Sequence, residues 1–291
     1  MKVSIGLPVR NGELFLKDAI DSILAQTYED FELIISDNAS TDRTREICES
    51  FTDSRIRYYH NEKNKGAAWN FNRVFELSNG EYFKWAAHDD ILAPEFLHAC
   101  VDVLEKDPSI ILSFTRVKFI DKNGKFLKDF PLKLKVDAVN SVKRFSEVLL
   151  RLHAWIYVFG VIRSNLLKKT DLICSYFGSD NVLVAHLSLL GRFVQIPDSL
   201  FFYRRHSGQS IRLVKDPPAF TAWFDPNTKG KIFFPQWRYF IEYYKLVKAP
   251  LNFKERMECY FWLELWLLLH SPFLAIDLFR AARSVLKRGF K

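Results

Sequence analysis

The sequence predicts an α/β fold in which helices flank a mainly parallel sheet, with a helical appendage at the C-terminal end. Two observations support this fold class. In the first 90 residues, short apolar runs typical of strands alternate with segments that have the spacing of amphipathic helices. From about residue 216 the composition changes, and stretches dense in aromatic and aliphatic residues follow. The 291 residues, 48% of them hydrophobic, suffice for one sizeable core plus an appendage.

Predicted strands and helices alternate along the first part of the chain. The strands cover residues 3–9, 31–36, 55–60 and 82–87, and the helices cover residues 14–24, 41–51 and 67–77. Each strand is followed by polar residues: Arg10, Asn11, Asp37, Asn38, Asn61, Asn64, Lys65, Asp89 and Asp90. Ligands of a parallel sheet bind beyond the carboxyl ends of its strands. These polar residues therefore form one candidate site.

Two adjacent carboxylates, Asp89 and Asp90, follow the fourth predicted strand. Neighbouring negative charges repel each other, and a divalent cation neutralises them. Oxygen ligands of this kind suit Mg²⁺ or Mn²⁺ bound together with phosphates. The alternative is a solvated loop before a helix, because Ala93-Pro94-Glu95 has the pattern of a first helical turn. The polar ends of the other three strands favour a metal site.

The residues at these strand ends resemble the family 2 inverting glycosyltransferases with the GT-A fold, which is a Rossmann-like fold. The resemblance covers roughly the first 210 residues. It is carried by four motifs in the family's order: Pro8-Val9-Arg10-Asn11, Leu33-Ile34-Ile35-Ser36-Asp37-Asn38-Ala39-Ser40-Thr41-Asp42, Asn64-Lys65-Gly66 and His88-Asp89-Asp90. The resemblance implies a nucleotide-sugar donor, with a UDP-sugar favoured, and Mn²⁺ or Mg²⁺ as cofactor.

The resemblance also implies a set of donor-binding residues: Pro8, Arg10, Asn11, Asp37, Asn64, Lys65 and Asp89. Asp37 would accept a hydrogen bond from the base, Asp89 would contact the ribose, and Asp90 would hold the metal that bridges the diphosphate. Many family members have an aromatic residue where Arg10 stands. A guanidinium can also stack on a base, so the role of this position is compatible with arginine.

Transfer of a sugar also requires a base that removes the proton of the acceptor hydroxyl. In the family this base begins a helix in the second half of the domain. The match here is Phe177-Gly178-Ser179-Asp180-Asn181, followed by an apolar helical run over residues 182–190. Many members have Glu-Asp at this place, and this chain keeps only the second acid. The alternative is that Ser179 or Asp180 merely caps the helix; the family order favours Asp180 as the catalytic base.

A third family element is the basic segment 203–210. Similar segments place a histidine near the metal and the diphosphate, so His206 is a predicted metal ligand. Arg204 or Arg205 could contact phosphate oxygens. The alternative is a basic, solvated loop.

The middle of the chain carries fewer indications. Residues 110–120, 192–197 and 199–203 are predicted strands, residues 141–152 form a predicted helix, and residues 121–125 have the composition of a hairpin turn. Residues 129–139 are predicted to form a loop over the site. Trp155 could form a platform for a sugar ring, with a place in the core as the alternative.

The formal net charge of +8 is compatible with nucleic acid, anionic lipid or a phosphorylated substrate. No RNA-binding motif, zinc-finger spacing or long basic run occurs, so no nucleic-acid partner is predicted. The four cysteines are far apart and no Cys-x-x-Cys is present, which indicates reduced thiols in a cytosolic protein. The chain enters its first strand without the pattern of a signal peptide, so a cytoplasmic location is expected.

The sequence predicts two regions, a catalytic domain over residues 1–215 and a helical region over residues 216–291. Residues 260–269 are apolar on nearly all sides, but Glu264, His270 and Pro272 interrupt the stretch, so no single helix is expected to span a bilayer. The final run is amphipathic and basic, with Arg280, Arg283 and Lys287 on one helical face. This pattern predicts docking on the inner face of a membrane. The alternatives are a helical hairpin that closes the core, and an oligomer contact.

These observations predict a metal-dependent inverting glycosyltransferase that moves one sugar to a saccharide or lipid-linked acceptor, in polysaccharide or glycan biosynthesis. The alternative is a catalytically silent nucleotide- or lipid-binding module, which the presence of both Asp90 and Asp180 disfavours. The glycine-rich dinucleotide fingerprint is missing after the first strand, which argues against an oxidoreductase. Processive synthases of the family usually carry Gln-x-x-Arg-Trp and several membrane spans, and Gln236-Trp237-Arg238 is not that motif. Addition of a single sugar is therefore predicted.

Overall fold

The structure of the protein is a computed structural model that describes residues 1–130, 136–150, 154–228, 234–248 and 251–289. Within these residues one sheet of nine strands has the order β3-β2-β1-β4-β8-β6-β9-β5, with β7 paired to β6. The strands are β1 (Val3–Val9), β2 (Phe31–Asp37), β3 (Ile56–His60), β4 (Tyr82–Trp85), β5 (Ile91–Leu92), β6 (Ile110–Ile120), β7 (Phe126–Asp129), β8 (Val161–Arg163) and β9 (Arg192–Arg204).

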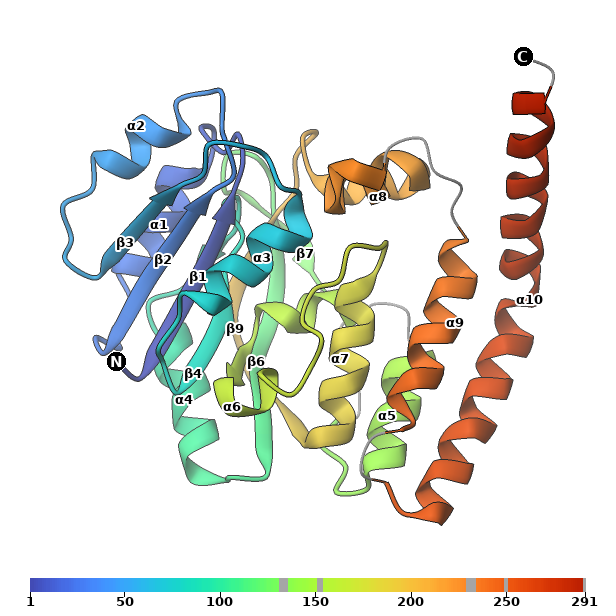
Figure 1. Cartoon of the computed structure of the whole chain (residues 1–291). Coiled ribbons are helices and arrows are strands. Elements are labelled where there is room, and N and C mark those ends of the chain that lie inside the picture. Colours follow the sequence, from blue (N-terminus) through green and yellow to red (C-terminus); the bar gives the residue numbers. More distant parts are fainter. Residues whose placement is uncertain (131–135, 151–153, 229–233, 249–250, 290–291) are drawn as a thin grey trace.

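The described chain also contains ten α-helices and three 3₁₀ helices. They are α1 (Leu16–Leu24), α2 (Thr44–Glu49), α3 (Ala67–Glu76), α4 (Phe96–Lys106), α5 (Ser141–Leu150), η1 (Ala154–Phe159), α6 (Ser164–Leu167), α7 (Ser179–Leu190), η2 (Ser210–Lys215), α8 (Pro217–Phe224), η3 (Pro226–Thr228), α9 (Pro235–Leu246) and α10 (Phe253–Gly289). Helices α9 and α10 stand side by side at the end of the molecule away from β3 (Figure 1).

The predicted α/β class is confirmed, and the sheet consists of two different halves. Strands β3, β2, β1 and β4 are parallel neighbours, as expected. All seven residues of β1 and of β2 are buried, as is typical of parallel strands covered on both faces. The second half is mixed, because β8 is antiparallel to β4 and β6 whereas β9 is parallel to β6. The two strands predicted over residues 192–203 are one strand, β9, with irregular register against β6.

Helix α8 belongs in space with the parallel half of the sheet, although it follows residue 215. The Asp216 side chain accepts a hydrogen bond from the Ala219 amide and so caps the helix, and prolines occupy its first turn. At the other end, the Phe224 carbonyl lies against Gly66, where a Cβ atom would be only 2.3 Å from the carbonyl oxygen. Gly66 has φ +91°, which L-residues rarely adopt. The boundary between residues 215 and 216 stays a prediction, and α8 packs across it.

The C-terminal helix differs from the sequence expectation, because α10 continues through Pro272 for 37 residues. Proline lacks the amide that would bond the carbonyl four residues earlier. The Ser271 hydroxyl donates to that carbonyl, on Leu268, at 2.8 Å. His270 adds a second local bond, with Nδ1 2.9 Å from the Trp266 carbonyl and its ring stacked on the indole. The helix therefore keeps its hydrogen bonding where the sequence indicated a break.

The expectation that no segment is long enough to span a bilayer is accordingly wrong on length. In the described chain one helical stretch, Phe253–Arg283, is long and apolar enough to cross a membrane, with a mean hydropathy of 1.4 over its best window. Only 28% of that window is buried inside the protein. Length and composition alone are weak evidence, because a core helix of a soluble protein can meet the same criteria.

The contact between α8 and Gly66 leads to a test with an internal control. Gly66→Ala should destabilise the fold more than Gly124→Ala, whose position also has positive φ, +83°, but has nothing within 4 Å of an added methyl group. Positive φ costs about 1–2 kcal/mol at Gly124. Gly66 has ψ 163° as well, a backbone region essentially limited to glycine, so its backbone cost is about 1–3 kcal/mol, and overpacking adds about 1–3 kcal/mol. Urea unfolding measures both free energies. Equal losses would contradict the close packing of α8 on Gly66.

Candidate active site

A cavity of about 990 Å³ is lined by residues at the carboxyl ends of β1, β2 and β4 and by residues of α8. The predicted site residues that line it are Pro8, Arg10, Asn11, Asn64, Asp89, Asp90 and Asp180. The structure thus brings together residues from both halves of the chain. Asp37, Lys65 and His206 do not line the cavity, and each has other contacts.

Asp90 is buried, and only one of its two carboxylate oxygens accepts a hydrogen bond from the described residues. Its Oδ1 atom accepts a hydrogen bond from the Arg204 amide at 2.9 Å, whereas no described residue hydrogen-bonds its buried Oδ2 atom. Burial, together with the negative charge of Asp89, raises the pKa of Asp90 well above its usual range. A buried carboxylate oxygen of this kind fits a site where a proton or a cation completes the charge balance.

Asp89 has the opposite electrostatic character. Burial disfavours its charged form, but the hydrogen bond with His206 and the nearby charge of His88 outweigh burial and lower its pKa. His206 Nε2 lies 2.8 Å from Asp89 Oδ2, and His206 Nδ1 accepts a hydrogen bond from the Gly208 amide at 3.2 Å. Nε2 therefore carries the proton that Asp89 accepts. Both nitrogens of the predicted metal ligand are engaged within the protein.

Among the described residues, no group of three or more histidine, cysteine or acidic side chains is arranged to hold a metal ion. The atom that fits a divalent cation is Asp90 Oδ2, because it is buried and lacks a hydrogen bond in the part of the chain described. His206 would have to give up its bond to Asp89 to become a second ligand. The geometry is therefore compatible with a metal at Asp90.

Arg204 does not face the cavity as a phosphate ligand would. Its guanidinium is 2% exposed and donates to the carbonyls of Asp89 and Lys122 and to the carboxylate of Asp18. It also lies 4.7 Å from the centre of the Phe15 ring. Arg204 thus fixes the loop that carries the two aspartates.

Lys84 is a buried charge that sequence reasoning did not identify. Its ammonium group, on β4 before the two aspartates, donates to the carbonyls of Trp85 and Phe159 and lies over the ring of Phe96 at 4.6 Å. Burial lowers its pKa to about 8, while the negative charge of Asp90 opposes that change. The sequence does carry one indication of this site: Lys84 is a charged residue within an otherwise apolar strand.

Asp37, predicted to contact the base, is fully buried and already satisfied. Its Oδ1 atom accepts from the Ser40 amide at 2.9 Å, and its Oδ2 atom lies 3.0 Å from the Tyr58 hydroxyl and 3.2 Å from His60 Nδ1. Tyr58 and His60 are two residues apart on β3, so their side chains lie on the same face of the sheet. In this structure Asp37 organises the neighbouring side chains instead of lining the cavity.

The adjacent residue, Asn38, holds the third family motif in place. Its amide nitrogen donates to Asn64 Oδ1 and to the Gly66 carbonyl, each at 3.0 Å, and its oxygen accepts from the Lys65 amide at 3.0 Å. The Lys65 ammonium lies over the Trp69 ring at 4.3 Å. Asn64 is thereby held at the cavity, and Lys65 is directed to the surface beside it.

Asn11 makes a similar connection between β1 and β2. Its side-chain oxygen accepts from the Thr41 amide at 2.9 Å, and its own amide donates to the Ser40 hydroxyl at 2.9 Å. The neighbouring Arg10 is exposed and free of any resolved ion pair in the described chain. It can therefore reach a ligand in the cavity without breaking an internal bond.

Asp180 lies in the first turn of α7 and is half-buried. Gly178 is the residue before the helix, and no side chain there forms a capping hydrogen bond, so neither Ser179 nor Asp180 is the cap. One Asp180 oxygen accepts from the Asn181 amide at 3.0 Å. Burial raises the pKa of Asp180 to about 6. This carboxylate is charged at neutral pH and more basic than an ordinary aspartate.

The cavity wall near Asp180 is aromatic. Phe71 and Phe159 come from the sheet domain, and Phe220, Trp223 and Phe224 come from α8. The contribution of α8 was not predicted, because its residues follow a proline-rich connector with no family motif. Trp155 lies in η1, but its side chain falls outside the described part of the structure, as does much of the loop predicted over residues 129–139.

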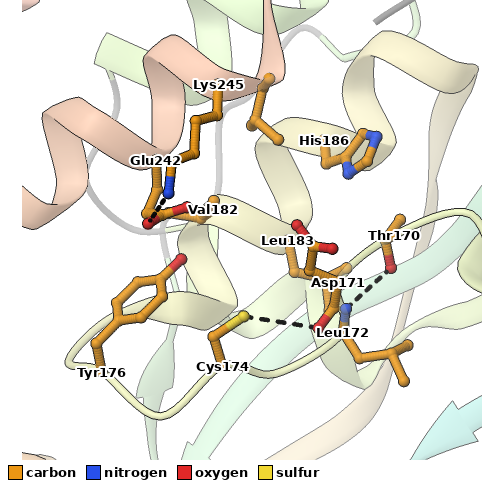
Figure 2. A pocket seen from close by; sticks show the side chains of 11 residues that line it. Thr170, Asp171, Leu172, Cys174, Tyr176, Val182, Leu183, His186, Glu242 and Lys245 are labelled. Atoms are coloured by element: carbon orange, nitrogen blue, oxygen red, sulfur yellow. Dashed lines mark hydrogen bonds and ion pairs between the residues drawn. The ribbon is translucent and has the colours of Figure 1, made fainter. Parts of the chain in front are cut away.

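A second, smaller cavity of about 210 Å³ lies between the 170–176 loop, α7 and α9 (Figure 2). The titratable side chains that line it include Asp171, His186, Glu242 and Lys245. Glu242 is paired with Lys245 at 2.9 Å and also with Arg238 of its own helix at 2.9 Å. This cavity contains none of the predicted site residues, so the larger cavity is the candidate active site.

Comparisons with known proteins identify the family of the chain. The model of the family described as glycosyl transferase family 2 matches residues 4–169, more than half of the chain. An uncharacterized glycosyltransferase of Rickettsia felis is 36% identical over 153 residues, which are 52% of this chain and 24% of that protein. Glycosyltransferase GlyG of Streptococcus pneumoniae serotype 4 is 28% identical over 221 residues, covering 72% of this chain and 73% of GlyG. The chain thus spans about a quarter of the Rickettsia relative's length.

Solved structures show the same fold at low sequence identity. TarS 1-349 of S. aureus, in complex with UDP-GlcNAc, has a TM-score of 0.62 at 16% identity, covering 89% of this chain and 69% of that chain. Mannosyltransferase PcManGT from Pyrobaculum calidifontis, in complex with GDP-Man and Mn²⁺, has a TM-score of 0.56 at 16% identity, covering 99% and 75%. The chain belongs to glycosyltransferase family 2, and it has a GT-A-like fold.

Proposed function

We propose that the protein is a metal-dependent inverting glycosyltransferase that moves one sugar from a nucleotide-diphosphate-sugar, a UDP-sugar in the first instance, to a saccharide or lipid-linked acceptor. The reaction would serve polysaccharide or glycan biosynthesis. One observation carries the proposal: a single cavity is lined by Asp89 and Asp90 after β4 and by Asp180 at the start of α7. The TarS and PcManGT structures were solved with UDP-GlcNAc and with GDP-Man, which suggests both donors for a first test.

The donor would lie along the ends of β1, β2 and β4. Arg10 has a free guanidinium that can stack on the base, and Asn64 is held at the cavity by Asn38. Pro8, Asn11 and Asp89 line the same side, and Lys65 lies beside it. Asp37 supports this region through Tyr58 and His60, and its predicted contact with the base would require one of these bonds to open.

Asp90 would hold the divalent cation through Oδ2, with His206 as a second ligand if it leaves Asp89. A bound Mn²⁺ or Mg²⁺ supplies positive charge where the leaving diphosphate becomes more negative. The chain's own contribution is to keep Asp90 in place through the Arg204 amide. The elevated pKa of Asp90 means that a cation and a proton compete for this oxygen.

Asp180 would remove the proton of the acceptor hydroxyl. Its elevated pKa makes it a better base while it remains charged at neutral pH. Direct attack by an activated hydroxyl in a single displacement inverts the configuration of the sugar. The aromatic residues of α8, Phe220 and Trp223 among them, offer stacking surfaces for an acceptor sugar near this base.

The C-terminal helix would bring this site to a membrane surface. One face of α10 packs on the rest of the protein through Cys259, Leu263, Trp266 and Leu274, which are almost fully buried. Other large apolar side chains of α10 are exposed: Phe253, Met257, Phe261, Leu268, Leu269, Phe273, Ile276, Leu278, Phe279 and Leu286. A helix with one face against protein cannot be surrounded by lipid, so docking on the inner face of a membrane is favoured over spanning it.

The exposed basic residues Arg280 and Arg283 would add attraction to anionic lipid. The side chain of Lys287 lies outside the described part of the structure. An oligomer contact through the same apolar face is the competing explanation, and the vesicle experiment below separates the two.

The donor and metal assignments can be tested with UDP-GlcNAc and GDP-mannose. With Mn²⁺ present, the correct donor should raise the melting temperature, because a ligand that binds only the folded state stabilises it. Asp90→Asn should lose the metal-dependent part of this rise and most turnover while folding normally.

NMR of the glycosidic linkage should show inversion of the donor's configuration. Full activity of Asp90→Asn, or a product of retained configuration, would exclude the proposal.

Asp180 should control the acid limb of the pH profile. Because its deprotonated form is the active one and its pKa is about 6, kcat/KM should fall as the pH drops through 6. Asp180→Asn should lower turnover by roughly 10²–10⁴-fold and leave donor affinity unchanged. The variant should be at least as stable as wild type at pH 7, since a charge that burial disfavours is removed. A collapse of donor binding with surviving turnover would place Asp180 in the donor site instead.

Membrane docking can be tested on vesicles of phosphatidylglycerol and phosphatidylcholine. Phe261, Leu268 and Phe279 are exposed and follow one another at intervals of seven and eleven residues, which places them on one helical face. Replacing all three with glutamate should weaken vesicle binding roughly 10-fold or more, since apolar burial is lost. The matched control replaces three exposed apolar residues elsewhere, Phe126, Leu127 and Val139, and should bind as wild type.

Binding of the unchanged protein should also weaken as salt rises, because exposed charges are screened. If the unchanged protein ignores anionic vesicles, or if the α10 variant instead converts a stable dimer to monomer, the apolar face is a protein contact.

A further inference from the structure

A tyrosine of the C-terminal region is packed directly on the backbone before Asp180. Tyr239, on α9, is 7% exposed, and a Cβ atom on Gly178 would lie only 1.4 Å from its hydroxyl oxygen. Gly178 also has φ +74°. Glycine is thus required twice at this position, for its backbone conformation and for the space that the tyrosine occupies.

The same tyrosine contacts residues on both sides of Asp180. Its ring lies edge-on to Phe177 with ring centres 5.8 Å apart, and its hydroxyl accepts a hydrogen bond from the Asn181 side chain at 3.4 Å. Tyr243, one turn further along α9, is stacked on Tyr239 with ring centres 5.9 Å apart. Burial raises the pKa of both hydroxyls, and the negative charge of Asp180 adds to this effect.

The contact between α7 and α9 is concentrated at this end. Further along the two helices, the 210 Å³ cavity opens between Val182, Leu183 and His186 of α7 and Glu242 and Lys245 of α9 (Figure 2). Packing there is incomplete. Tyr239 is consequently the α9 residue that contacts the start of α7, at Gly178 and Asn181.

Helix α9 is in turn fixed by α10. The Gln236 amide donates to the Asp277 carboxylate at 2.7 Å, and the Trp237 indole donates to the Leu274 carbonyl at 3.2 Å. Trp266 lies edge-on to Tyr243 with ring centres 5.8 Å apart. A continuous series of contacts therefore leads from the long C-terminal helix to the residues around Asp180.

We propose that Tyr239 is a positioning residue for Asp180, so that the α9–α10 hairpin completes the catalytic site. The proposal rests on the proposed function in one respect, the role of Asp180 as base. The residues before α7 form turns and bends in the described structure, with no strand to hold them. A base must be held close to its productive geometry, and a displacement of about 1 Å can cost about 100-fold in rate. Through its contacts with Phe177, Gly178 and Asn181, Tyr239 supplies the missing support on both sides of Asp180 in the chain.

The test compares Tyr239→Ala and Tyr239→Phe with matched changes at Tyr244. Tyr244 is on the same helix but is 46% exposed. The first measurement is the pKa of the Asp180 carboxyl by ¹³C NMR, assigned by its loss in Asp180→Asn; it requires no acceptor. Tyr239→Ala should lower this pKa by about one unit or more, because water replaces the ring. Tyr239→Phe, which keeps the ring, and both Tyr244 variants should retain the wild-type value near 6.

The second measurement separates positioning from general loss of structure. In the donor reaction, Tyr239→Ala should reduce kcat by about 10- to 100-fold, while the affinity for UDP with Mn²⁺, measured by calorimetry, stays within about twofold. Tyr239→Phe should show a smaller loss of kcat, again with UDP affinity unchanged, and it carries the test if Tyr239→Ala does not fold. The Tyr244 variants should match wild type in both quantities.

Two results would overturn the proposal: an Asp180 pKa and kcat that do not respond to Tyr239→Ala, or a parallel loss of kcat and UDP affinity in every folded Tyr239 variant. Failure of the base assignment would look different. In that case Asp180→Asn would retain turnover, whereas the NMR titration would still report whether Tyr239 shields the carboxylate.

Discussion

The bonds of Arg204 hold the two halves of this protein together at the site. Its backbone amide binds Asp90, and its guanidinium binds the carbonyls of Asp89 and Lys122 and the carboxylate of Asp18. Asp89 and Asp90 follow the parallel half of the sheet, whereas Arg204 ends β9 in the mixed half. A buried guanidinium is costly unless its donors are satisfied. The aspartate loop, the β6–β7 turn and α1 supply those acceptors, so the charge fixes three separate segments in one arrangement.

That arrangement leaves the aspartate pair with one free, buried oxygen. Asp89 is satisfied by His206, whereas Asp90 Oδ2 has no hydrogen bond in the described chain. Lys84 lies on β4, the strand that precedes them; its ammonium group donates to two carbonyls and lies over an aromatic ring, and the charge of Asp90 also favours its charged form. Burial and the charge of Asp89 raise the pKa of Asp90, so a proton or a cation at its Oδ2 atom stabilises the pair. Under the proposed function, the cation that accompanies a donor diphosphate would occupy this oxygen.

The parallel half could be predicted because its signals are local. A fully buried strand such as β1 is a continuous apolar run, and the predicted range 3–9 matches Val3–Val9. The partners of buried polar groups depend on tertiary pairing. Arg204 is the last residue of β9 and is buried, whereas the next residue, Arg205, is exposed. The sequence could not say which of these two basic side chains is buried, because the acceptors of Arg204 come from distant segments of the chain. Asp37 is similar, because the tyrosine and histidine that satisfy it belong to the next strand of the sheet.

The length of the C-terminal helix was predicted wrongly because Pro272 was expected to interrupt it. In α10 a serine hydroxyl replaces the missing amide, and the ring of His270 stacks within the same turn. The continuous helix contacts both ends of α9, through Trp266 near one end and through Leu274 and Asp277 near the other. A helix broken at Pro272 could not keep both contacts in one orientation. The continuity of α10 is therefore what holds α9, and with it Tyr239, against the start of α7.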